Sequence, residues 1–212
     1  MKIKAIIVIA LFFPTIGFGQ IWHAGIKAGV ALSNFRNPTS WTEGIHTGYS
    51  FGATAYKQIR SNFGLGFEFQ YQQKGYNHVL CETITDKLHA EYLEVPIMAD
   101  YVFLIPGVKN LKGHVNAGGY AAYWLKGRYE MTGFGETEES FDFERSSARR
   151  FDFGPVAGGR LEWVRNHGSF SLDFRYAHGV SDMIKNKSDD TSRNTNRTFI
   201  VGLSYMRILN FL

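Results

Sequence analysis

Hydrophobic and polar residues alternate with a period of two along much of the chain. In residues 63–75, FGLGFEFQYQQKG, Phe, Leu and Tyr occupy every second position up to Tyr71, and Gly, Glu and Gln lie between them. Such a pattern puts one kind of side chain on each face of an extended strand. The same alternation recurs along the chain and predicts eight strands, at 24–35, 45–58, 63–75, 91–104, 113–128, 150–165, 169–180 and 196–207.

The predicted strands and their connections are typical of a membrane barrel. The strands exceed the five or six residues common in soluble sheets and reach the roughly 9 to 11 that a tilted strand needs to cross a bilayer. Short connections at 59–62, 105–112 and 166–168 alternate with long polar ones at 36–44, 76–90, 129–149 and 181–195. Short periplasmic turns and long outer loops are the pattern of bacterial outer-membrane barrels. The sequence therefore predicts an all-β fold, an eight-stranded antiparallel up-and-down transmembrane β-barrel.

The width of such a barrel decides which face of the strands points inward. An eight-stranded barrel has room for little more than its own side chains, and rows of Phe, Tyr and Trp from every strand would overfill it. Glycine alternating with charges of both signs fits better, because opposite charges can pair there. We expect a lumenal charge network of Lys27, Glu68, Lys74, Glu94, Asp100, Lys126, Asp152, Arg160, Glu162, Asp173 and Arg175. We interpret this network as a paired plug, with a proton or ion path as the alternative. The alternative to the membrane fold is a soluble lipocalin-like binding barrel.

The N-terminus has the order of a secretory signal peptide. Lys2 and Lys4 precede an apolar run at 5–13, followed by Pro14 and small residues before Gln20. We expect residues 1–19 to be the signal peptide, with an anchoring or buried helix as the alternative, and residues 20–212 to form the outer-membrane barrel domain. The chain is thus predicted to be exported through the periplasm to the bacterial outer membrane.

Composition narrows the possible partners. The formal charge of +4 includes the two N-terminal lysines, and the other basic residues are scattered among acids, so a nucleic-acid partner is not expected. Cys81 is the only cysteine, which excludes an internal disulfide. Pro96 and Pro155 lie inside predicted strands, where each should cause a bulge or a missing ladder bond.

Several segments resemble a known family. GIKAGVALSNF (25–35), FEFQYQQKG (67–75), YLEVPIMADYVF (92–103), NAGGYAAYWLKGR (116–128), FDFGPVAGGRLEW (151–163) and FSLDFRYAHGVSDM (170–183) resemble the PorT-like outer-membrane β-barrel family. The resemblance spans nearly all of the chain after residue 19, and both Pro96 and Pro155 fall within it. It implies an eight-stranded outer-membrane barrel. It also implies a link to protein secretion for the founding member, but no catalytic residue set.

Two groups of reactive side chains are candidates for a catalytic or a metal site. His178, Ser181 and Asp182 lie together where the seventh strand meets its loop, and a histidine beside a serine suggests a rim-located lipid-modifying enzyme as the alternative function. His78, Cys81 and His89, with Glu82 and Asp86, share the second long loop but do not have a known zinc spacing. We therefore expect no catalytic residue, metal or cofactor.

The long loops are the best place for a protein partner. Glu136, Glu138 and Glu139 form an acidic cluster followed by Arg149 and Arg150. Adjacent acidic and basic groups of this kind could contact a protein or the lipopolysaccharide surface. The simpler interpretation is a solvated loop. The sequence thus predicts a non-enzymatic, monomeric barrel that serves as a structural, secretion-accessory or surface-interaction component, in contact with outer-membrane lipid and lipopolysaccharide.

Overall fold

The computed structural model describes residues 21–36, 43–81, 84–133, 137–140, 149–182 and 195–210. The predicted signal peptide lies outside these residues. The strands are β1 (Ile21–Arg36), β2 (Glu43–Gly44), β3 (His46–Arg60), β4 (Phe63–Cys81), β5 (Ile84–Leu104), β6 (Leu111–Thr132), β7 (Thr137–Ser140), β8 (Phe151–Arg165), β9 (Gly168–His178) and β10 (Thr195–Asn210). None of the described residues lies in a helix long and apolar enough to cross a membrane.

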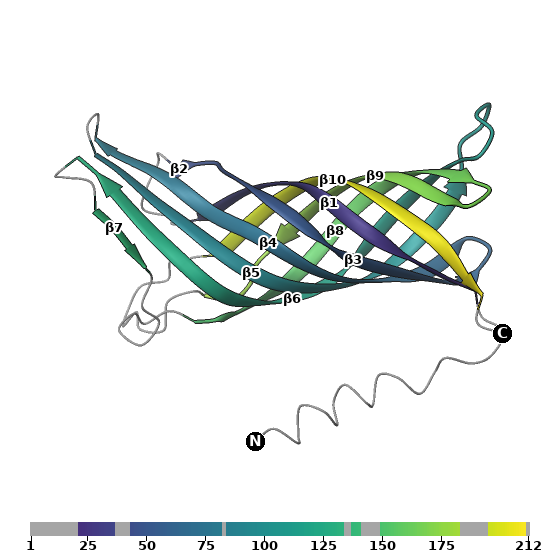
Figure 1. Cartoon of the computed structure of the whole chain (residues 1–212), viewed down its shortest axis with the longest axis horizontal. Helices are drawn as coiled ribbons and strands as arrows, with labels where there is room; N and C mark the ends of the chain where they lie inside the picture. Colours follow the sequence, from purple (N-terminus) through teal and green to yellow (C-terminus); the bar gives the residue numbers. More distant parts are fainter. Residues whose placement is uncertain are drawn as a thin grey trace, which may run out of the picture.

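Eight of these strands close into a ring, which confirms the predicted fold class. The antiparallel order is β4-β3-β1-β10-β9-β8-β6-β5, and pairing between β4 and β5 completes the circle (Figure 1). The connections after β3, β5 and β8 are short and all lie at one end, which we call the short-turn end; the opposite end is the long-loop end. Every long strand therefore has a partner on both sides, which leaves no open sheet edge in the ring.

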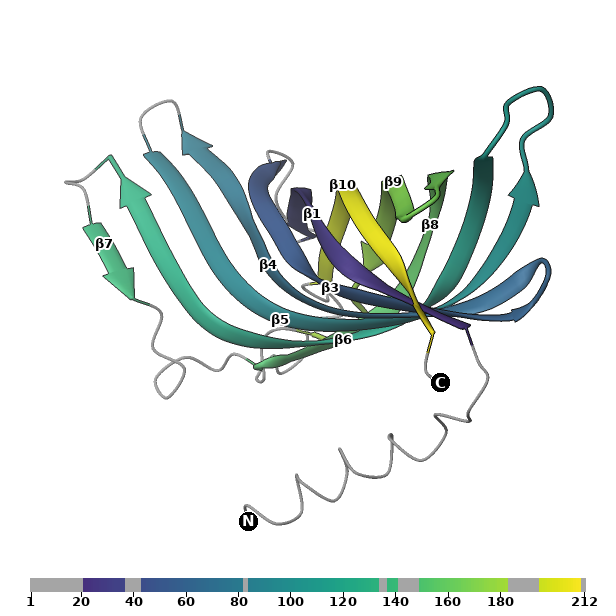
Figure 2. The ribbon, with the colours of Figure 1, turned by 45° about the vertical axis from the view of Figure 1, so that its right-hand side comes forward.

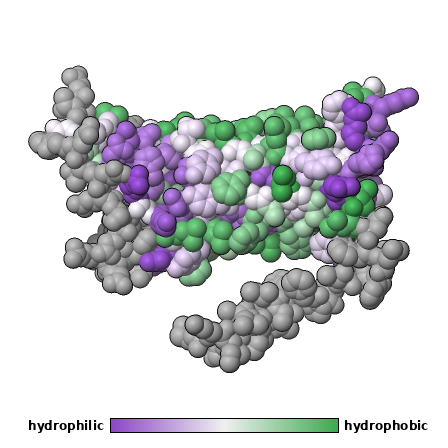
Figure 3. All heavy atoms as spheres, in the orientation of Figure 1, coloured by the Kyte–Doolittle hydropathy of each residue, from purple (hydrophilic) through white to green (hydrophobic). Residues whose placement is uncertain are grey.

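The oily face of the strands points outward, as the narrow lumen requires. Apolar residues cover the middle of the wall (Figure 3), and each of the following side chains is more than half exposed: Ile26, Phe51, Phe69, Phe153 and Leu203. The alternating positions between them are mostly buried inside the ring. Glycine makes room there: a Cβ at Gly202 would lie 3.4 Å from Cε of Lys27, whose long side chain crosses that space.

The second long loop is not where the sequence placed it. Residues 76–90 were predicted as a loop, but β4 continues to Cys81 and β5 begins at Ile84, so most of this stretch is a hairpin. Beyond the membrane the outward face meets water instead of lipid. Leu88 and Ala90 are therefore buried inward, and the outward apolar row that marks the membrane strands ends. β6 likewise runs to Thr132, and Thr137–Ser140 of the predicted third loop forms β7.

Three strands therefore project past the rest of the ring. Pairing of β3 with β4 stops at Ser50 and Gln72, and pairing of β6 with β8 stops at Tyr123 and Phe151. Residues 73–81 of β4, 84–91 of β5 and 124–132 of β6, with β7, continue together beyond that level (Figure 2). We call this part the outer sheet extension.

The two strand prolines disturb the ladder without a bulge. The partners Phe67–Ile97 and Gln70–Glu94 keep one register, but the positions between them, which include Pro96, are unpaired with β4. Pairing of β8 with β9 begins at Val156, the residue after Pro155. Register shifts occur elsewhere, at Gln58/Arg60, Val79/Cys81 and Glu91/Tyr92. The expected missing bond is thus found beside Pro96, whereas neither proline forms a bulge.

Candidate functional site

Ten residues of the predicted charge network lie on the inner face, and none is more than 8% exposed. They are four cations and six carboxylates: Lys27, Lys74, Arg160, Arg175, Glu68, Glu94, Asp100, Asp152, Glu162 and Asp173. They fall into three layers along the barrel axis, which follow from the register of neighbouring strands.

The middle layer joins opposite walls of the barrel. Arg175 on β9 donates to both carboxylate oxygens of Glu68 on β4, at 2.5 Å and 2.8 Å, although three strands separate β9 from β4 in the ring. Nζ of Lys27 on β1 lies 3.6 Å from Glu68 and 3.4 Å from Asp173. The hydroxyl of Ser204 donates to Asp173 at 3.0 Å. A two-pronged bond of this kind fixes both distance and orientation across the interior.

The layer toward the long-loop end is built around Lys74, which is fully buried. Its ammonium lies 2.6 Å from a carboxylate oxygen of Glu94 and 3.8 Å from one of Asp152. The same nitrogen lies 5.0 Å and 4.8 Å from the ring centres of Tyr92 and Tyr120. Paired carboxylates and aromatic faces replace the water that a buried ammonium has lost.

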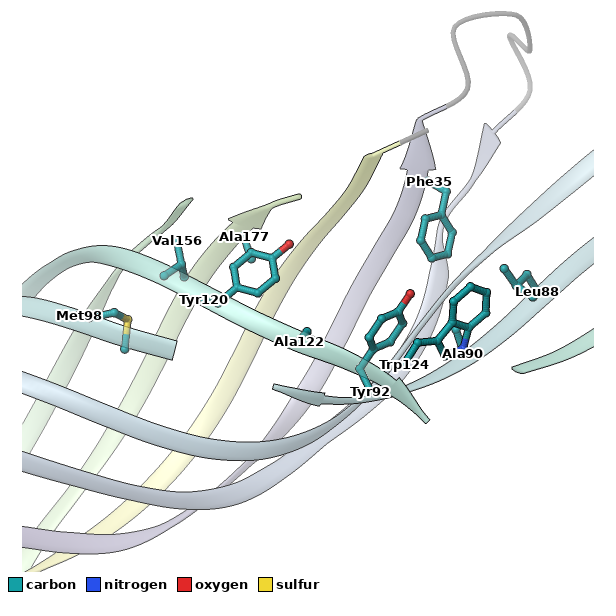
Figure 4. Packing of buried hydrophobic residues seen from close by; sticks show 10 residues of the cluster. All are labelled: Phe35, Leu88, Ala90, Tyr92, Met98, Tyr120, Ala122, Trp124, Val156 and Ala177. Carbon is teal, nitrogen blue, oxygen red and sulfur yellow. The ribbon is translucent and has the colours of Figure 1, made fainter. Parts of the chain in front are cut away.

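Asp152 is the most fully hydrogen-bonded acid of this layer. Tyr120 donates its phenol to Oδ2 at 3.0 Å, Ser181 donates its hydroxyl to Oδ1 at 2.6 Å, and the Asn196 amide donates to Oδ2 at 3.3 Å. These donors come from β6, from the residues after β9 and from β10, so the carboxylate ties several strands together. Above it, Tyr92 and Trp124 stack at 5.7 Å within a cluster of buried apolar residues (Figure 4).

The third layer, nearest the short-turn end, contains a histidine between two acids. Nδ1 of His114 lies 3.2 Å from Asp100, and Nε2 lies 3.1 Å from Glu162. Arg160 donates to Asp100 at 2.5 Å, and its guanidinium carbon lies 5.5 Å from the ring centre of Tyr56. An imidazolium could donate to both carboxylates, which would offset part of the excess of acids over cations in the lumen.

A cavity of about 250 Å³ lies below this layer and is lined by residues that include His23, Tyr56, Lys112, His114 and Glu162.

Lys126 is the one predicted network residue that does not face the lumen, and that prediction is wrong. Tyr92 pairs with Trp124, but Glu91 pairs with Lys126, so Leu125 is an extra residue in β6. A one-residue bulge moves the following side chains to the opposite face. Lys126 therefore lies exposed on the outer side, opposite Glu91.

Sequence reasoning also missed most of the neutral partners. Tyr56, Tyr92, Tyr120 and Ser181 complete the layers, as does His114, although the period of two placed His114 on the polar face of its strand. The signal that identifies these residues is a polar or aromatic side chain at an inward position next to a charge. Which charge it meets depends on register, and register is not visible in one strand alone.

The His178, Ser181 and Asp182 group, the basis of the enzyme alternative, is not assembled as a catalytic site. Ser181 points into the barrel, where its hydroxyl is buried and donates to Asp152. His178 is held on the outer side, where Nδ1 lies 3.5 Å from the exposed hydroxyl of Tyr176. A histidine base must reach the hydroxyl that it activates. The arrangement does not support a His178 and Ser181 pair.

The two histidines considered as metal ligands, His78 and His89, are also separated. His78 pairs with Asp86, whereas His89 pairs with Gly75, which puts the two imidazoles on opposite faces of the β4 and β5 hairpin. The His78 ring stacks on Tyr76 at 4.3 Å, and the His89 ring meets His46 edge-on at 4.7 Å. Within the described part of the chain, no group of three or more His, Cys, Asp or Glu could hold a metal ion.

The predicted interaction residues of the long-loop end lie partly within strands. Glu138 and Glu139 belong to β7 and pair with Glu130 and Tyr129 of β6. Arg149 and Arg150 are exposed before β8, and Arg150 donates to the Tyr123 hydroxyl at 3.4 Å. Glu136 lies outside the described residues.

Comparisons with known proteins agree with this fold. The family model described as outer membrane protein beta-barrel domain matches residues 18–185. No curated protein matches the chain in sequence. Solved structures that are similar in fold include the following three.

The first of these is the attachment invasion locus protein Ail of Yersinia pestis, at 14% identity and a TM-score of 0.42, covering 87% of this chain and 97% of that chain. OprG from Pseudomonas aeruginosa is similar at 10% identity and a TM-score of 0.45, with coverages of 89% and 93%. The outer membrane enzyme PagL is similar at 12% identity and a TM-score of 0.44, with coverages of 83% and 97%. At these identities the likeness concerns the fold alone.

Proposed function

Since the chain belongs to the outer membrane protein beta-barrel domain family, we propose that it is a non-enzymatic barrel of the bacterial outer membrane with a closed lumen, acting through its outer sheet extension. The observation that carries the proposal is the Arg175 and Glu68 pair, which crosses the lumen and is almost fully buried. With the layers of Lys74 and Arg160 on either side of it, an ion would have to break at least one buried pair to pass.

The energetic argument favours a plug over a path. An eight-stranded barrel leaves no aqueous channel once its interior side chains are in place. Separating a buried pair leaves charges without water or partner, which costs about 3–5 kcal/mol for each pair broken. The three layers of buried pairs together form a structural core that keeps the wall rigid and its strands in register.

The outer sheet extension is the part that is free to meet a partner. Its outward face carries charges of both signs at moderate exposure: Nζ of Lys87 lies 3.6 Å from Glu130, and Nε2 of His89 lies 3.8 Å from the other Glu130 oxygen. Surface pairs of this kind are weak and can exchange for contacts with another protein. The resemblance to the PorT-like family makes an envelope or secretion-system protein the partner that we propose.

Conductance tests the closed lumen. The purified protein, reconstituted in planar bilayers, is expected to give no current above the background of protein-free membranes. A porin of known conductance, reconstituted in the same way, is the positive control. The Glu68→Ala and Arg175→Ala double variant should also stay at background, because the layers of Lys74 and Arg160 still close the lumen. Steady single-channel openings of the unaltered protein would contradict the proposal.

Site-specific cross-linking tests the interaction surface. A photoreactive residue at Lys87, in the outer sheet extension, should give a defined protein adduct in intact cells. The same residue at Ala53, on the lipid-facing wall, is the matched control and should give none. The adduct from position 87 should weaken when Glu130 is changed to Lys, because the charge pattern of that face is then reversed. Adducts at both positions, or at neither, would count against this surface.

A further inference from the structure

The short-turn end carries exposed charges of one sign only. Across described residues 21–23, 57–62, 105–112, 165–168 and 207–209 there are six Lys and Arg residues and no carboxylate: Lys57, Arg60, Lys109, Lys112, Arg165 and Arg207. The nearest acids, Asp100 and Glu162, are buried inside the barrel and paired with Arg160 and His114. The outer sheet extension, in contrast, mixes both signs.

Two of these cations lie beside tryptophan rings on the lipid-facing side of the wall. Nζ of Lys57 lies 5.4 Å from the ring centre of Trp22, and the guanidinium carbon of Arg165 lies 4.5 Å from that of Trp163. Arg207 is exposed and follows Tyr205, which packs on Phe170 at 4.8 Å. We call Lys57, Arg165 and Arg207, with Trp22 and Trp163, the basic girdle.

The girdle lies at the height where acyl chains end and headgroups begin. On β10, the outward positions between Arg207 and Arg197 are Tyr205, Leu203, Val201 and Phe199. At a rise of about 3.4 Å per residue and a tilt of about 40°, that stretch covers roughly 25 Å along the membrane normal, which is the height of the apolar band of such barrels. Arg207 therefore lies at one boundary of the apolar band and Arg197 at the other.

We propose that the basic girdle binds the headgroups of anionic phospholipids in the leaflet that faces the periplasm. A guanidinium can donate two parallel hydrogen bonds to a phosphate, and an ammonium supplies a point charge. The tryptophans beside Lys57 and Arg165 fill the space between the headgroup and the first methylene groups. No acid within the girdle competes for these cations.

The distribution of the girdle favours lipid over an acidic protein. Lys57 is on β3 and Arg165 is on β8, and β1, β10 and β9 lie between them in the ring. A single docked protein would contact one side, whereas headgroups surround the whole circumference. The cations also stand on the wall beside apolar residues rather than at the tips of the turns.

Quenching by brominated lipids tests the proposal with native reporters. The chain has four tryptophans; in a Trp41→Phe background, Trp22 and Trp163 face lipid, while Trp124 is 2% exposed inside the lumen. The protein is placed in nanodiscs of phosphatidylcholine with a minor share of phosphatidylglycerol, and either lipid carries the bromine. Bromine on phosphatidylglycerol should quench at least about threefold more per molecule than bromine on phosphatidylcholine, since each nearby Lys or Arg attracts anionic lipid severalfold.

In the girdle variant Lys57→Gln, Arg165→Gln, Arg207→Gln, the preference should be lost, so that the two brominated lipids quench about equally. In the unaltered protein, 0.5 M salt should weaken the preference. The control variant Lys87→Gln, Lys126→Gln, Arg150→Gln removes the same charge from the long-loop end and should keep the preference. Heat-modifiable migration in gels shows that each variant is folded. Equal quenching in the unaltered protein, or a preference that survives in the girdle variant, would overturn the proposal.

Discussion

The central pair of the lumen allows a sharp test of how this barrel is stabilised. The perturbation is Glu68→Gln, which keeps the shape of the side chain and removes its charge. Arg175, only 2% exposed, would lose its ion pair and keep at most one hydrogen bond, to the amide oxygen, and Lys27 would keep Asp173 alone at 3.4 Å. Two buried cations would then share one carboxylate in that layer. Removal of one partner from a buried pair costs about 3–5 kcal/mol, and we expect a loss of that size in the free energy of unfolding.

A matched surface variant separates burial from distance. The closest oxygen of Glu130 lies 3.6 Å from Nζ of Lys87, the same separation as between Lys27 and Glu68, but both side chains of the surface pair are 36% exposed. Glu130→Gln should therefore cost no more than about 1 kcal/mol, because water screens the lost interaction. Both free energies come from urea unfolding in lipid vesicles, followed by tryptophan fluorescence and by migration in unboiled gels.

A double-mutant cycle completes the test. Arg175→Gln alone leaves Glu68 short of a partner, whereas the double variant removes both charges and retains the Lys27 and Asp173 pair. The double variant should be more stable than the sum of the two single losses predicts, by about 2 kcal/mol or more. The reasoning is refuted if Glu68→Gln costs no more than Glu130→Gln, or if the two single losses simply add.

Other expectations follow from single residues. A membrane-impermeant amine reagent should modify Lys126, which is exposed by the β6 bulge, and leave buried Lys74 unmodified; a lack of labelling at both lysines would place Lys126 inside. In the outer sheet extension, burial raises the pKa of Asp86 above its ordinary value of 3.8, so the folded hairpin holds this proton more tightly than the unfolded chain does. Local stability should then fall as the pH rises through the window above 3.8, and Asp86→Asn should remove that dependence in hydrogen exchange of residues 76–90 measured from pH 3.5 to 6. His178→Ala should leave the lipid A mass spectrum of cells unchanged, and a defined mass shift would favour the enzyme alternative.

The outer sheet extension shows where the hydrophobic pattern stops being informative. In the membrane, one face of each strand meets lipid, so residues such as Phe67 and Glu68 contrast sharply. From Lys87 to Tyr92 polar and apolar residues still alternate, but the apolar ones, such as Leu88 and Ala90, are buried inward because the outward face now meets water. The strands continue nonetheless, because pairing of β4 with β5 needs only backbone groups.

For the candidate chemistry, proximity in the sequence was a poor guide. His178 and Ser181 are three positions apart, and because this number is odd, the alternation of faces that continues past β9 puts them on opposite sides of the wall. Asp152 and Ser181 are distant in the sequence and hydrogen-bonded in the barrel. A strand orders its side chains by face, and neighbours across the lumen come from other strands.

The sequence by itself determined which face of each membrane strand is apolar, how many strands form the ring and that short and long connections alternate. These properties are local, because side-chain direction alternates with each residue and turn length depends on adjacent segments. Tertiary structure decided that Arg175 pairs with Glu68 although three strands separate them in the ring, and that Lys126 points outward after a bulge. It also decided that β4, β5 and β6 extend beyond the other strands of the ring. Each of these depends on the register between strands, which is set when the barrel closes and every strand acquires a partner on both sides.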